Sequence, residues 1–399
     1  MKILVINCGS SSLKYQLIDM DGEQMVAKGL CERIGIDGKI KASTADGREK
    51  KFEIDLPNHT AAFYEVKKLI TEGDLKVVDS LDEITAIGHR VVQGGALFKE
   101  SCLVTEEVKA GIASLNDLAP LHNPAHIEGI NAAQEVFGMD KPEVVVFDNA
   151  FHSTMPPKAY IYPFPYEYYE KYQVRKYGAH GTSHRYVSTR LHELHPEYRK
   201  VIICHLGNGS SITAVKDGKV IDTSMGLTPL DGFIMGSRCG AVDPSAVTFI
   251  MEKEHMTPAE ASTMMNKKSG FLGVSGVSSD MRDVEIAAAG GNERAQLALD
   301  IFYYQVPKII AGYMTALQGL DALVFTAGIS ENGANVREGI CEKLEFLGIK
   351  IDKEKNDGLR GKEAQLNTPD SKVDIFLIPT NEELMIARDT KAIVEGMAK

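Results

Sequence analysis

Two short turns made of small residues could hold a phosphate group. Residues 7–12 read Asn-Cys-Gly-Ser-Ser-Ser and are followed by Lys14, while residues 207–211 read Gly-Asn-Gly-Ser-Ser. Small residues let backbone N–H groups approach an anion, hydroxyl groups add donors, and a lysine adds a point charge. The P-loop motif GxxxxGK[ST] is absent, so the two turns predict a polyphosphate cradle of another kind.

Two arginines stand beside glycines, which would clear space for a ligand. Arg90 lies in Gly-His-Arg-Val-Val-Gln-Gly-Gly, and Arg238 lies in Gly-Ser-Arg-Cys-Gly. A guanidinium group binds a carboxylate or a phosphate through two parallel hydrogen bonds. Each arginine alone is also consistent with an ordinary surface loop.

Asp148 and two histidine pairs are further candidates. Asp148 ends the apolar run 144–147, where α/β proteins place ligand chemistry but also use aspartate simply to close turns. The pattern HxxxH occurs at 122–126 and 180–184. Zinc is disfavoured because HExxH is absent, and Gly181 predicts a loop at the second pair. Donation to a phosphoryl or carboxylate oxygen is the better reading, with structural roles open for His126 and His184.

Two late segments complete the set of candidates. Residues 326–333 follow an apolar strand with a glycine turn and a helix start, which favours a nucleotide shelf. Residues 379–384 open the last helix, where Thr380 or Asn381 could act as the N-cap. Helix capping explains the acidic residues there without a metal, so metal binding by Glu382 needs other support.

The elements that must position these residues alternate between strands and helices, which predicts an α/β fold. We expect strands at residues 2–6, 14–18, 86–92, 144–147, 201–205, 212–215, 322–326 and 374–378. We expect helices at residues 124–137, 244–254, 258–266, 293–317 and 382–397. Both small-residue turns lie between apolar strands and therefore predict β-hairpins. One hairpin opening each half indicates a duplicated domain, although two unrelated hairpins with similar turns remain an alternative.

Prolines between residues 148 and 160 predict the domain boundary. The first domain would span residues 1–150 and the second residues 151–381. The final helix, residues 382–399, could pack back on the first domain.

Composition excludes several classes of protein. The 399 residues carry a formal net charge of −11, which argues against non-specific nucleic-acid binding. The start of the chain has no signal-peptide pattern, and no apolar run reaches membrane-spanning length. Six cysteines are scattered without metal spacing. We therefore expect reduced thiols in a cytoplasmic protein that has no membrane partner.

Taken together, these segments resemble the acetate kinase (acetokinase) family, which belongs with sugar kinases, Hsp70 and actin. The resemblance runs essentially from end to end. The matching stretches are residues 7–14, 88–92, 120–124, 147–148, 180–184, 205–211, 222–226, 278–282, 326–328 and 381–384. The family implies two duplicated actin-like (ribonuclease H-like) α/β domains with a cleft between them, the second binding the nucleotide. It also implies a homodimer that makes acetyl phosphate from acetate and ATP, reversibly.

The resemblance implies roles residue by residue. Asn7 and Glu382 would assist Mg²⁺, with Mn²⁺ as an alternative. ATP or ADP would contact Lys14, His205, Leu206, Gly207, Asn208, Gly209, Asp280, Met281, Arg282, Gly328, Ile329, Ser330, Glu331 and Asn332, with Ser10 and Ser12 in the phosphate loop. The acid would contact Arg90, Val92, Leu121, His122 and Pro229. Catalysis would use Asp148, His180, Arg238 and Arg90, by direct in-line phosphoryl transfer. A carboxylate is already ionised at pH 7, so we expect Asp148 to orient an arginine or metal-bound water rather than to act as a base.

Several residues depart from the family pattern. They are Ala179, where Phe is usual, and Gln93, Asn149, Cys239, Ala241 and Ser330. Loss of the ring at Ala179 predicts an acyl pocket that also admits propionate or butyrate. A propionate or butyrate kinase, a pyrophosphate-dependent enzyme and a nucleotide-gated binding protein without turnover are the alternatives. Retention of Gly328 favours ATP over pyrophosphate, and the intact charged residues favour an enzyme.

Overall fold

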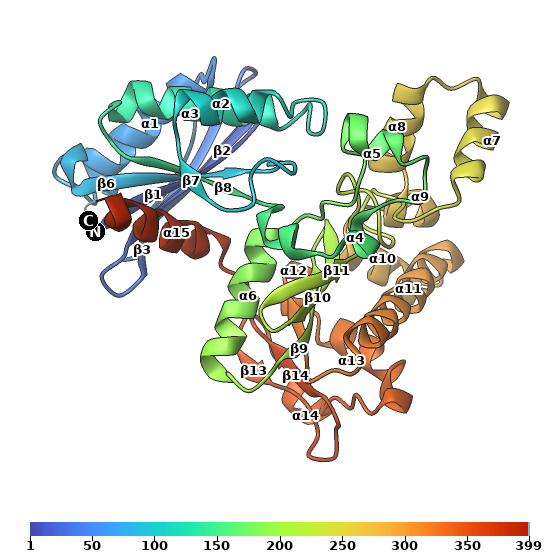
Figure 1. Ribbon diagram of the computed structural model, residues 1–399. Coiled ribbons are helices and arrows are strands. Elements are labelled where there is room, and N and C mark those ends of the chain that lie inside the picture. The colour runs from blue at the N-terminus through green and yellow to red at the C-terminus, as the bar shows by residue number, and fades with distance from the viewer. Residues whose placement is uncertain (398–399) are drawn as a thin grey trace. The chain divides into compact units, whose positions relative to one another are not determined.

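The computed structural model describes residues 1–397 (Figure 1). The chain divides into two compact units. Unit 1 holds residues 1–151 and the segment that begins at residue 381, and unit 2 holds residues 152–380. Each unit contains one β-sheet with helices, which confirms the α/β fold class.

Unit 1 is built on a sheet in the order β5-β4-β3-β2-β1-β6-β8-β7. The strands are β1 (Lys2–Gly9), β2 (Ser12–Asp19), β3 (Gln24–Glu32), β4 (Lys39–Thr44), β5 (Glu49–Glu53), β6 (Ile84–Val91), β7 (Cys102–Leu103) and β8 (Glu143–Phe147). The helices are α1 (His59–Thr71), α2 (Glu106–Ala113), α3 (Asn123–Phe137) and α15 (Glu382–Met397). Figure 1 shows α1 and α3 on one face of this sheet and α15 on the other.

Helix α15 packs closely on strand β6 because Gly88 has no side chain. A Cβ atom at Gly88 would lie 2.5 Å from Thr390 Oγ1 and 2.7 Å from Ile386 Cγ2. Both contact residues belong to α15, so this glycine sets how near the helix can come to the strand. The segment that follows residue 381 is thereby tied to the core of unit 1.

Unit 2 is built on a sheet in the order β11-β10-β9-β12-β14-β13. The strands are β9 (Lys200–Leu206), β10 (Ser210–Lys216), β11 (Lys219–Thr223), β12 (Ala322–Thr326), β13 (Ala364–Gln365) and β14 (Asp374–Leu377). The helices are α4 (Pro157–Tyr160), α5 (Glu167–Tyr172), α6 (Gly181–Leu194), α7 (Pro244–Glu254), α8 (Pro258–Lys267), α9 (Gly270–Ser275), α10 (Met281–Ala289), α11 (Glu293–Leu317), α12 (Gly328–Asn332), α13 (Ala334–Glu342) and α14 (Lys353–Asn356). Short 3₁₀ helices cover Gly73–Leu75, Leu81–Glu83, Ala150–Thr154 and Glu345–Leu347.

The two sheets share one strand pattern. The series β3-β2-β1-β6-β8 in unit 1 corresponds to β11-β10-β9-β12-β14 in unit 2. In each series the first three strands are antiparallel neighbours, and the last two run parallel to the third. The hairpins β1–β2 and β9–β10 occupy the same place in both sheets, which accounts for their similar turns in the sequence.

One expectation about local structure is wrong. Residues 180–184 were expected to form a loop because of Gly181, but Gly181 begins helix α6 and His180 is its N-cap. His180 has φ 58°, in the left-handed region, which turns the chain sharply enough for a helix to start at a glycine. Separately, no helix within residues 1–397 is long and apolar enough to cross a membrane.

Candidate active site

Arg90 in unit 1 lies between two carboxylates. Its Nη2 donates a 3.0 Å hydrogen bond to Asp148 Oδ2, and its Nε lies 3.9 Å from Glu382 Oε2. Arg90 is on β6, Asp148 directly follows β8, and Glu382 opens α15. Burial opposes the charge on Arg90, but the two carboxylates outweigh burial and raise its pKa. The guanidinium therefore stays charged in a largely enclosed place.

The ionisation of Glu382 is strongly disturbed by its surroundings. Burial raises its pKa to about 7, the charges of Asp148 and Glu383 add to the rise, and Arg90 and Lys14 oppose it. The side chain still has 25% of its surface exposed. A partly accessible carboxylate that ionises near neutral pH would gain from a cation beside it.

The turn of hairpin β1–β2 carries the other candidates of unit 1. Asn7 and Lys14 lie opposite each other across the hairpin, and Ser10 is exposed at its tip. Helix α1 supports the turn, since His59 Nε2 lies 2.8 Å from the carbonyl oxygen of Gly9. The hydrogen bond from α1 therefore supports a turn whose tip is exposed to solvent.

Two of the residues that depart from the family pattern hold the backbone beyond Arg90. Asn149 Oδ1 accepts a 2.8 Å hydrogen bond from the Gly94 N–H, and Gln93 Oε1 accepts one of 2.8 Å from the Gly95 N–H. Both side chains are buried. Their amide oxygens thus accept hydrogen bonds from the backbone N–H groups of the glycine turn that follows β6. Three residues of unit 1 were expected to contact the carboxylic acid substrate. Among them, Val92 is half-buried, and Leu121 and His122 are exposed.

Histidines 180 and 205 in unit 2 stack on each other. The ring centroids are 4.1 Å apart and the planes differ by 19°. His180 Nδ1 lies 2.9 Å from Ser211 Oγ, and His205 Nδ1 lies 2.8 Å from Ser183 Oγ. Each ring is therefore fixed both by its neighbour and by a serine hydroxyl.

Arg238 and His180 converge at Gly209. A Cβ atom at Gly209 would lie 3.3 Å from Arg238 Nη1 and 3.4 Å from His180 Nε2. Arg238 Nη1 also donates a 3.0 Å hydrogen bond to the carbonyl oxygen of Pro229. Burial lowers the pKa of Arg238, as expected for a guanidinium that is removed from water. Two polar nitrogen atoms thus lie close to the backbone of this glycine, an arrangement suited to an anion.

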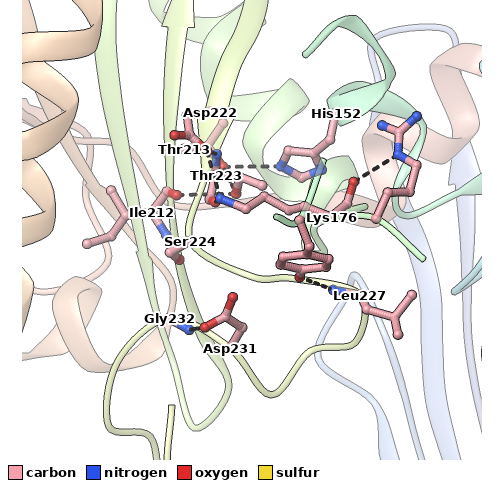
Figure 2. A network of polar contacts seen from close by, with 12 residues as sticks. His152, Lys176, Ile212, Thr213, Asp222, Thr223, Ser224, Leu227, Asp231 and Gly232 are labelled. Carbon is pink, nitrogen blue, oxygen red and sulfur yellow. Dashed lines mark hydrogen bonds and ion pairs between the residues drawn. The ribbon is translucent and has the colours of Figure 1, made fainter. Parts of the chain in front are cut away.

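A polar network holds the strand that carries Ser211 (Figure 2). His152 Nε2 lies 3.1 Å from Thr213 Oγ1, which lies 2.8 Å from Thr223 Oγ1. Lys176 Nζ donates hydrogen bonds of 2.9 Å to Asp222 Oδ1 and to the Thr223 carbonyl oxygen. These bonds lock β10 to β11 from the side chains as well as the backbone.

A cavity of about 750 Å³ lies in unit 2 next to the β9–β10 turn. Eight of the residues expected at the nucleotide line it, namely Gly207, Asn208, Asp280, Met281, Arg282, Gly328, Ile329 and Asn332. A Cβ atom at Gly328 would meet no atom within 4 Å. The volume falls in the range of small-molecule sites, and the space over Gly328 is open.

Other residues expected at the nucleotide do not line this cavity. Ser330 is fully buried, and its hydroxyl donates a 2.5 Å hydrogen bond to the Thr326 carbonyl oxygen. Glu331 Oε1 accepts hydrogen bonds from the N–H groups of Ala327 at 2.7 Å and Thr380 at 2.9 Å. His205, Leu206 and Gly209 lie on or beside the hairpin, and Lys14 belongs to unit 1.

Six further residues line the cavity, namely Ser279, Glu285, Gly333, Asn335, Val336 and Arg360. Ser279 and Gly333 lie in the segments 278–282 and 326–333, which the sequence had already marked, and the other four were not singled out from the sequence. Glu285 follows Arg282 by three positions on α10, and this helical spacing was an available signal. Arg360 lies in an irregular segment, so nothing in its neighbourhood in the sequence could have marked it.

The residues of unit 1 suit a magnesium ion held mainly by water and phosphate. Within residues 1–397 no group of three or more His, Cys, Asp and Glu side chains could enclose a metal. Mg²⁺ usually binds one or two carboxylates and keeps several waters alongside substrate phosphates. The carboxylate of Glu382 and the amide of Asn7 provide that kind of oxygen donor.

Ala179 packs against two methionines. Ala179, Met225 and Met235 form a small buried apolar cluster, with exposed fractions of 6%, 0% and 1%. The methionine side chains thus occupy space beside the small alanine. Since methionine is unbranched and flexible, it can fill such a gap and also repack around a ligand.

Comparison with known proteins identifies relatives along the whole chain. The sequence profile described as "Acetokinase family" matches residues 2–388. The acetate kinase of Methanosarcina mazei is 56% identical over 100% of this chain and 98% of its own length.

Solved structures are similar as well. A crystal structure of Porphyromonas gingivalis acetate kinase has a TM-score of 0.95 and 44% identity, and the match covers 98% of this chain and 99% of that one. A propionate kinase from Francisella tularensis has a TM-score of 0.91 and 45% identity, with coverage of 98% and 99%.

Proposed function

Because the chain belongs to the acetokinase family, we propose that it transfers the γ-phosphoryl group of ATP to the carboxylate of acetate. The products would be acetyl phosphate and ADP, and the reverse reaction would return ATP. The observation that carries this proposal is the convergence of Arg238 Nη1 and His180 Nε2 on Gly209, beside the 750 Å³ cavity.

The residues of unit 2 fit the phosphoryl donor. The cavity would take the nucleoside, and the β9–β10 turn would take the phosphates, because its glycines leave the backbone N–H groups accessible. Arg238 and His180 would donate hydrogen bonds to the equatorial oxygens, whose charge must be held during transfer. The open space over Gly328 favours ATP over a donor that lacks adenosine.

The residues of unit 1 fit the acceptor. Arg90 would bind the acid's carboxylate, and Asp148 would hold the guanidinium in position through the 3.0 Å hydrogen bond. This arrangement supports an orienting role for Asp148, since an ionised acid needs no base. Mg²⁺, or Mn²⁺ in its place, would be assisted by Asn7 and Glu382 and would supply positive charge to the ATP phosphates. Val92, Leu121 and His122 would form the walls of the acyl site within this unit.

A colorimetric hydroxamate assay tests the proposal. Enzyme, ATP, Mg²⁺ and acetate should yield an acyl hydroxamate when hydroxylamine is present. Absence of product with acetate, propionate and butyrate would favour the nucleotide-gated binding protein instead.

Propionate is the second candidate substrate. The small Ala179 lies among flexible methionines, and the similar Francisella tularensis protein is named a propionate kinase. We propose that propionate is phosphorylated and butyrate more slowly. Values of kcat/KM for the three acids in the wild type and in Ala179→Phe test this, since the ring should reduce the use of the longer acids. If the relative kcat/KM values for the three acids were the same in both proteins, Ala179 would not be part of the acyl site.

We also propose a cytoplasmic homodimer. Helix α7 has no buried residue, and Phe249 on it is 59% exposed. An isolated helix of 11 residues is marginal in water, so a second copy of the chain is a reasonable cover for it. Sedimentation of the wild type and of Phe249→Asp would show a dimer and its weakening, and a monomeric wild type would contradict the proposal.

A further inference from the structure

Arg337 on helix α13 is a completely buried arginine, with 0% of its surface exposed. Burial lowers the pKa of its guanidinium to about 10, so the group still carries its charge at pH 7. A buried ion is costly unless its hydrogen bonds are satisfied. The acceptors around Arg337 therefore show what this charge holds together.

The guanidinium donates hydrogen bonds to two separate segments of the chain. On one side, Nη1 donates to the carbonyl oxygen of Ser330, which belongs to helix α12. On the other side, Nη2 donates to the Leu359 carbonyl oxygen at 3.0 Å and Nε donates to Asn356 Oδ1 at 2.7 Å. Both of these acceptors belong to the 356–361 segment. Because the guanidinium is planar and its donors have fixed directions, it holds α12 and this segment at a fixed separation.

Two more hydrogen bonds hold the same segment to the helices. The Gly361 N–H donates to the carbonyl oxygen of Glu331 on α12 at 3.0 Å, and Asn356 Nδ2 donates to the carbonyl oxygen of Ala334 on α13 at 2.8 Å. The fully buried amide of Asn356 thus serves α13 with its nitrogen and Arg337 with its oxygen. The segment is therefore attached to α12 and α13 from both of its ends.

Both α12 and the 356–361 segment form walls of the cavity of about 750 Å³. Gly328 and Ile329 line it from α12, and Arg360 lines it from the segment. Since Arg337 is fully buried, it can act on a ligand only through these walls. The hydrogen bonds of one guanidinium thus set the distance between two sides of the cavity.

A ligand binds more tightly when the walls of its site are already in place. Ordering a loop at the moment of binding costs free energy, and a preformed site avoids this cost. The 356–361 segment contains two glycines with left-handed φ angles, 65° at Gly358 and 55° at Gly361. Glycine increases the conformational freedom that must be restricted. The hydrogen bonds from Arg337 restrict it in the folded protein before any ligand arrives.

We propose that Arg337 is a positioning residue that holds α12 and the 356–361 segment at the spacing that fits the nucleoside part of ATP. The role rests on the proposed function, because it assumes that the cavity binds the nucleotide. The planar guanidinium is needed rather than the charge alone, since the single ammonium group of a lysine is a point charge without the fixed fork of donors. The same contacts present Arg360 to the cavity.

Calorimetric titration with Mg²⁺ and ADP tests the role without turnover. Arg337→Lys and Arg337→Met should each raise the Kd for ADP at least about tenfold, because both lose the directed bonds to the two walls. The matched control is Lys176→Met. Lys176 is also a largely buried cation of unit 2 that donates to a backbone carbonyl, at Thr223, but it lines a different cavity. The control should keep the wild-type Kd, and wild-type affinity in Arg337→Lys would overturn the proposal.

Kinetics separates positioning from general destabilisation. Arg337→Lys should raise KM for ATP about tenfold and leave both kcat at saturating ATP and KM for acetate within about twofold. The assays are run well below the thermal midpoint of each variant, so that unfolded protein does not contribute. A lower kcat with an unchanged KM for ATP would contradict the role.

Asn356→Leu provides a second measurement if neither Arg337 variant folds. Leucine is similar in size to asparagine but cannot accept the hydrogen bond from Nε, so the guanidinium loses one contact to the segment. The Kd for ADP should rise about threefold or more. An unchanged Kd in this variant would show that the contacts of Arg337 do not shape the cavity.

The binding test and the proposed reaction can fail separately. A wild type that binds ADP but makes no acyl phosphate would overturn the reaction, and weaker binding in Arg337→Lys would leave the positioning role standing. An active wild type whose Arg337 variants bind ADP normally would do the reverse. A wild type without affinity for ADP would contradict both.

Discussion

Arg90 Nη2 donates a 3.0 Å hydrogen bond to the Oδ2 atom of Asp148, a carboxylate with only 1% of its side chain exposed. The two residues come from neighbouring parallel strands, at the ends where β6 and β8 finish. Taking a charged pair out of water costs desolvation, so this pair is weak evidence for added stability. In the proposed reaction, Asp148 keeps one edge of the guanidinium occupied and so directs the remaining donors toward the acid.

Replacing Asp148 tests this orienting role. Asp148→Asn should lower kcat about 10²- to 10³-fold, the range seen when one preorganised electrostatic contact is lost, because the amide no longer fixes Arg90. Steady-state kinetics with saturating ATP would measure it. The control is the thermal midpoint, which should show that the variant is folded at the assay temperature. A folded variant with normal turnover would refute any essential role for Asp148.

A side chain at Gly328 should fill the open part of the nucleotide cavity. Gly328→Gln is expected to raise the Kd for ATP at least about tenfold, or about 1.4 kcal/mol, because it occupies space that no atom now takes. Calorimetric titration with ATP measures the change. The matched control is Gly312→Gln on α11, which is equally free of neighbours within 4 Å and lies outside this cavity. Equal affinities in both variants would place the nucleotide elsewhere.

Replacing Ala327 with glycine should stabilise the folded protein. It has φ 68° and ψ 164° at the start of α12, a region of backbone space that is essentially confined to glycine and costs about 1–3 kcal/mol for other residues. Glycine adds about 0.5–1 kcal/mol of unfolded-state entropy, so Ala327→Gly should still gain about 1 kcal/mol. Urea unfolding measures this. A destabilised variant would mean that the strain at Ala327 is smaller than this geometry indicates.

His126 should make the protein sensitive to acid. Burial, and then the nearby charges of Arg90 and His122, lower its pKa from 6.5 to about 3. The unfolded chain therefore binds this proton first, so stability is lost as pH falls from 6.5 toward 3. The loss between pH 7 and pH 5 should be about 2 kcal/mol.

The ionisation of Glu382 has the opposite effect on stability between pH 7 and pH 5. Its raised pKa, about 7 against an ordinary 4.5, means that its contribution to stability falls as pH rises through 7. Urea unfolding of the wild type and of His126→Gln at pH 5 and pH 7 separates the two groups. The variant should lose less stability in acid, and an identical loss in both proteins would show that His126 is not the group responsible.

Some helices were predicted from the sequence with their correct bounds, and others were not predicted. The helix at residues 293–317 and the last helix, predicted at residues 382–397, have these bounds in the structure, because their apolar residues recur with helical spacing and their ends carry strong signals. The predicted extension of the last helix to residue 399 lies outside the described residues. Helices α1 and α6 were not predicted. At α6 the obstacle was Gly181, since only the left-handed His180 before it makes a helix start there.

The sequence predicted which residue types form the candidate site, but it did not predict which side chains contact one another. Glycine and arginine patterns marked Arg90, Gly209 and Arg238, and the family is confirmed by relatives along the whole chain. Arg360 could not be found because its segment has no periodicity. The contacts of Ser183 with His205 and Thr380 join residues that are 22 and 197 positions apart, which only the folded chain reveals.

Phosphorus-31 NMR of the purified protein with ATP, Mg²⁺ and acetate tests the central claim most directly. We predict loss of the γ-phosphate signal of ATP and growth of acetyl phosphate and ADP signals in equal amounts, with little free phosphate. Unchanged ATP, or ATP hydrolysed to free phosphate without any acyl phosphate from acetate or propionate, would contradict the account.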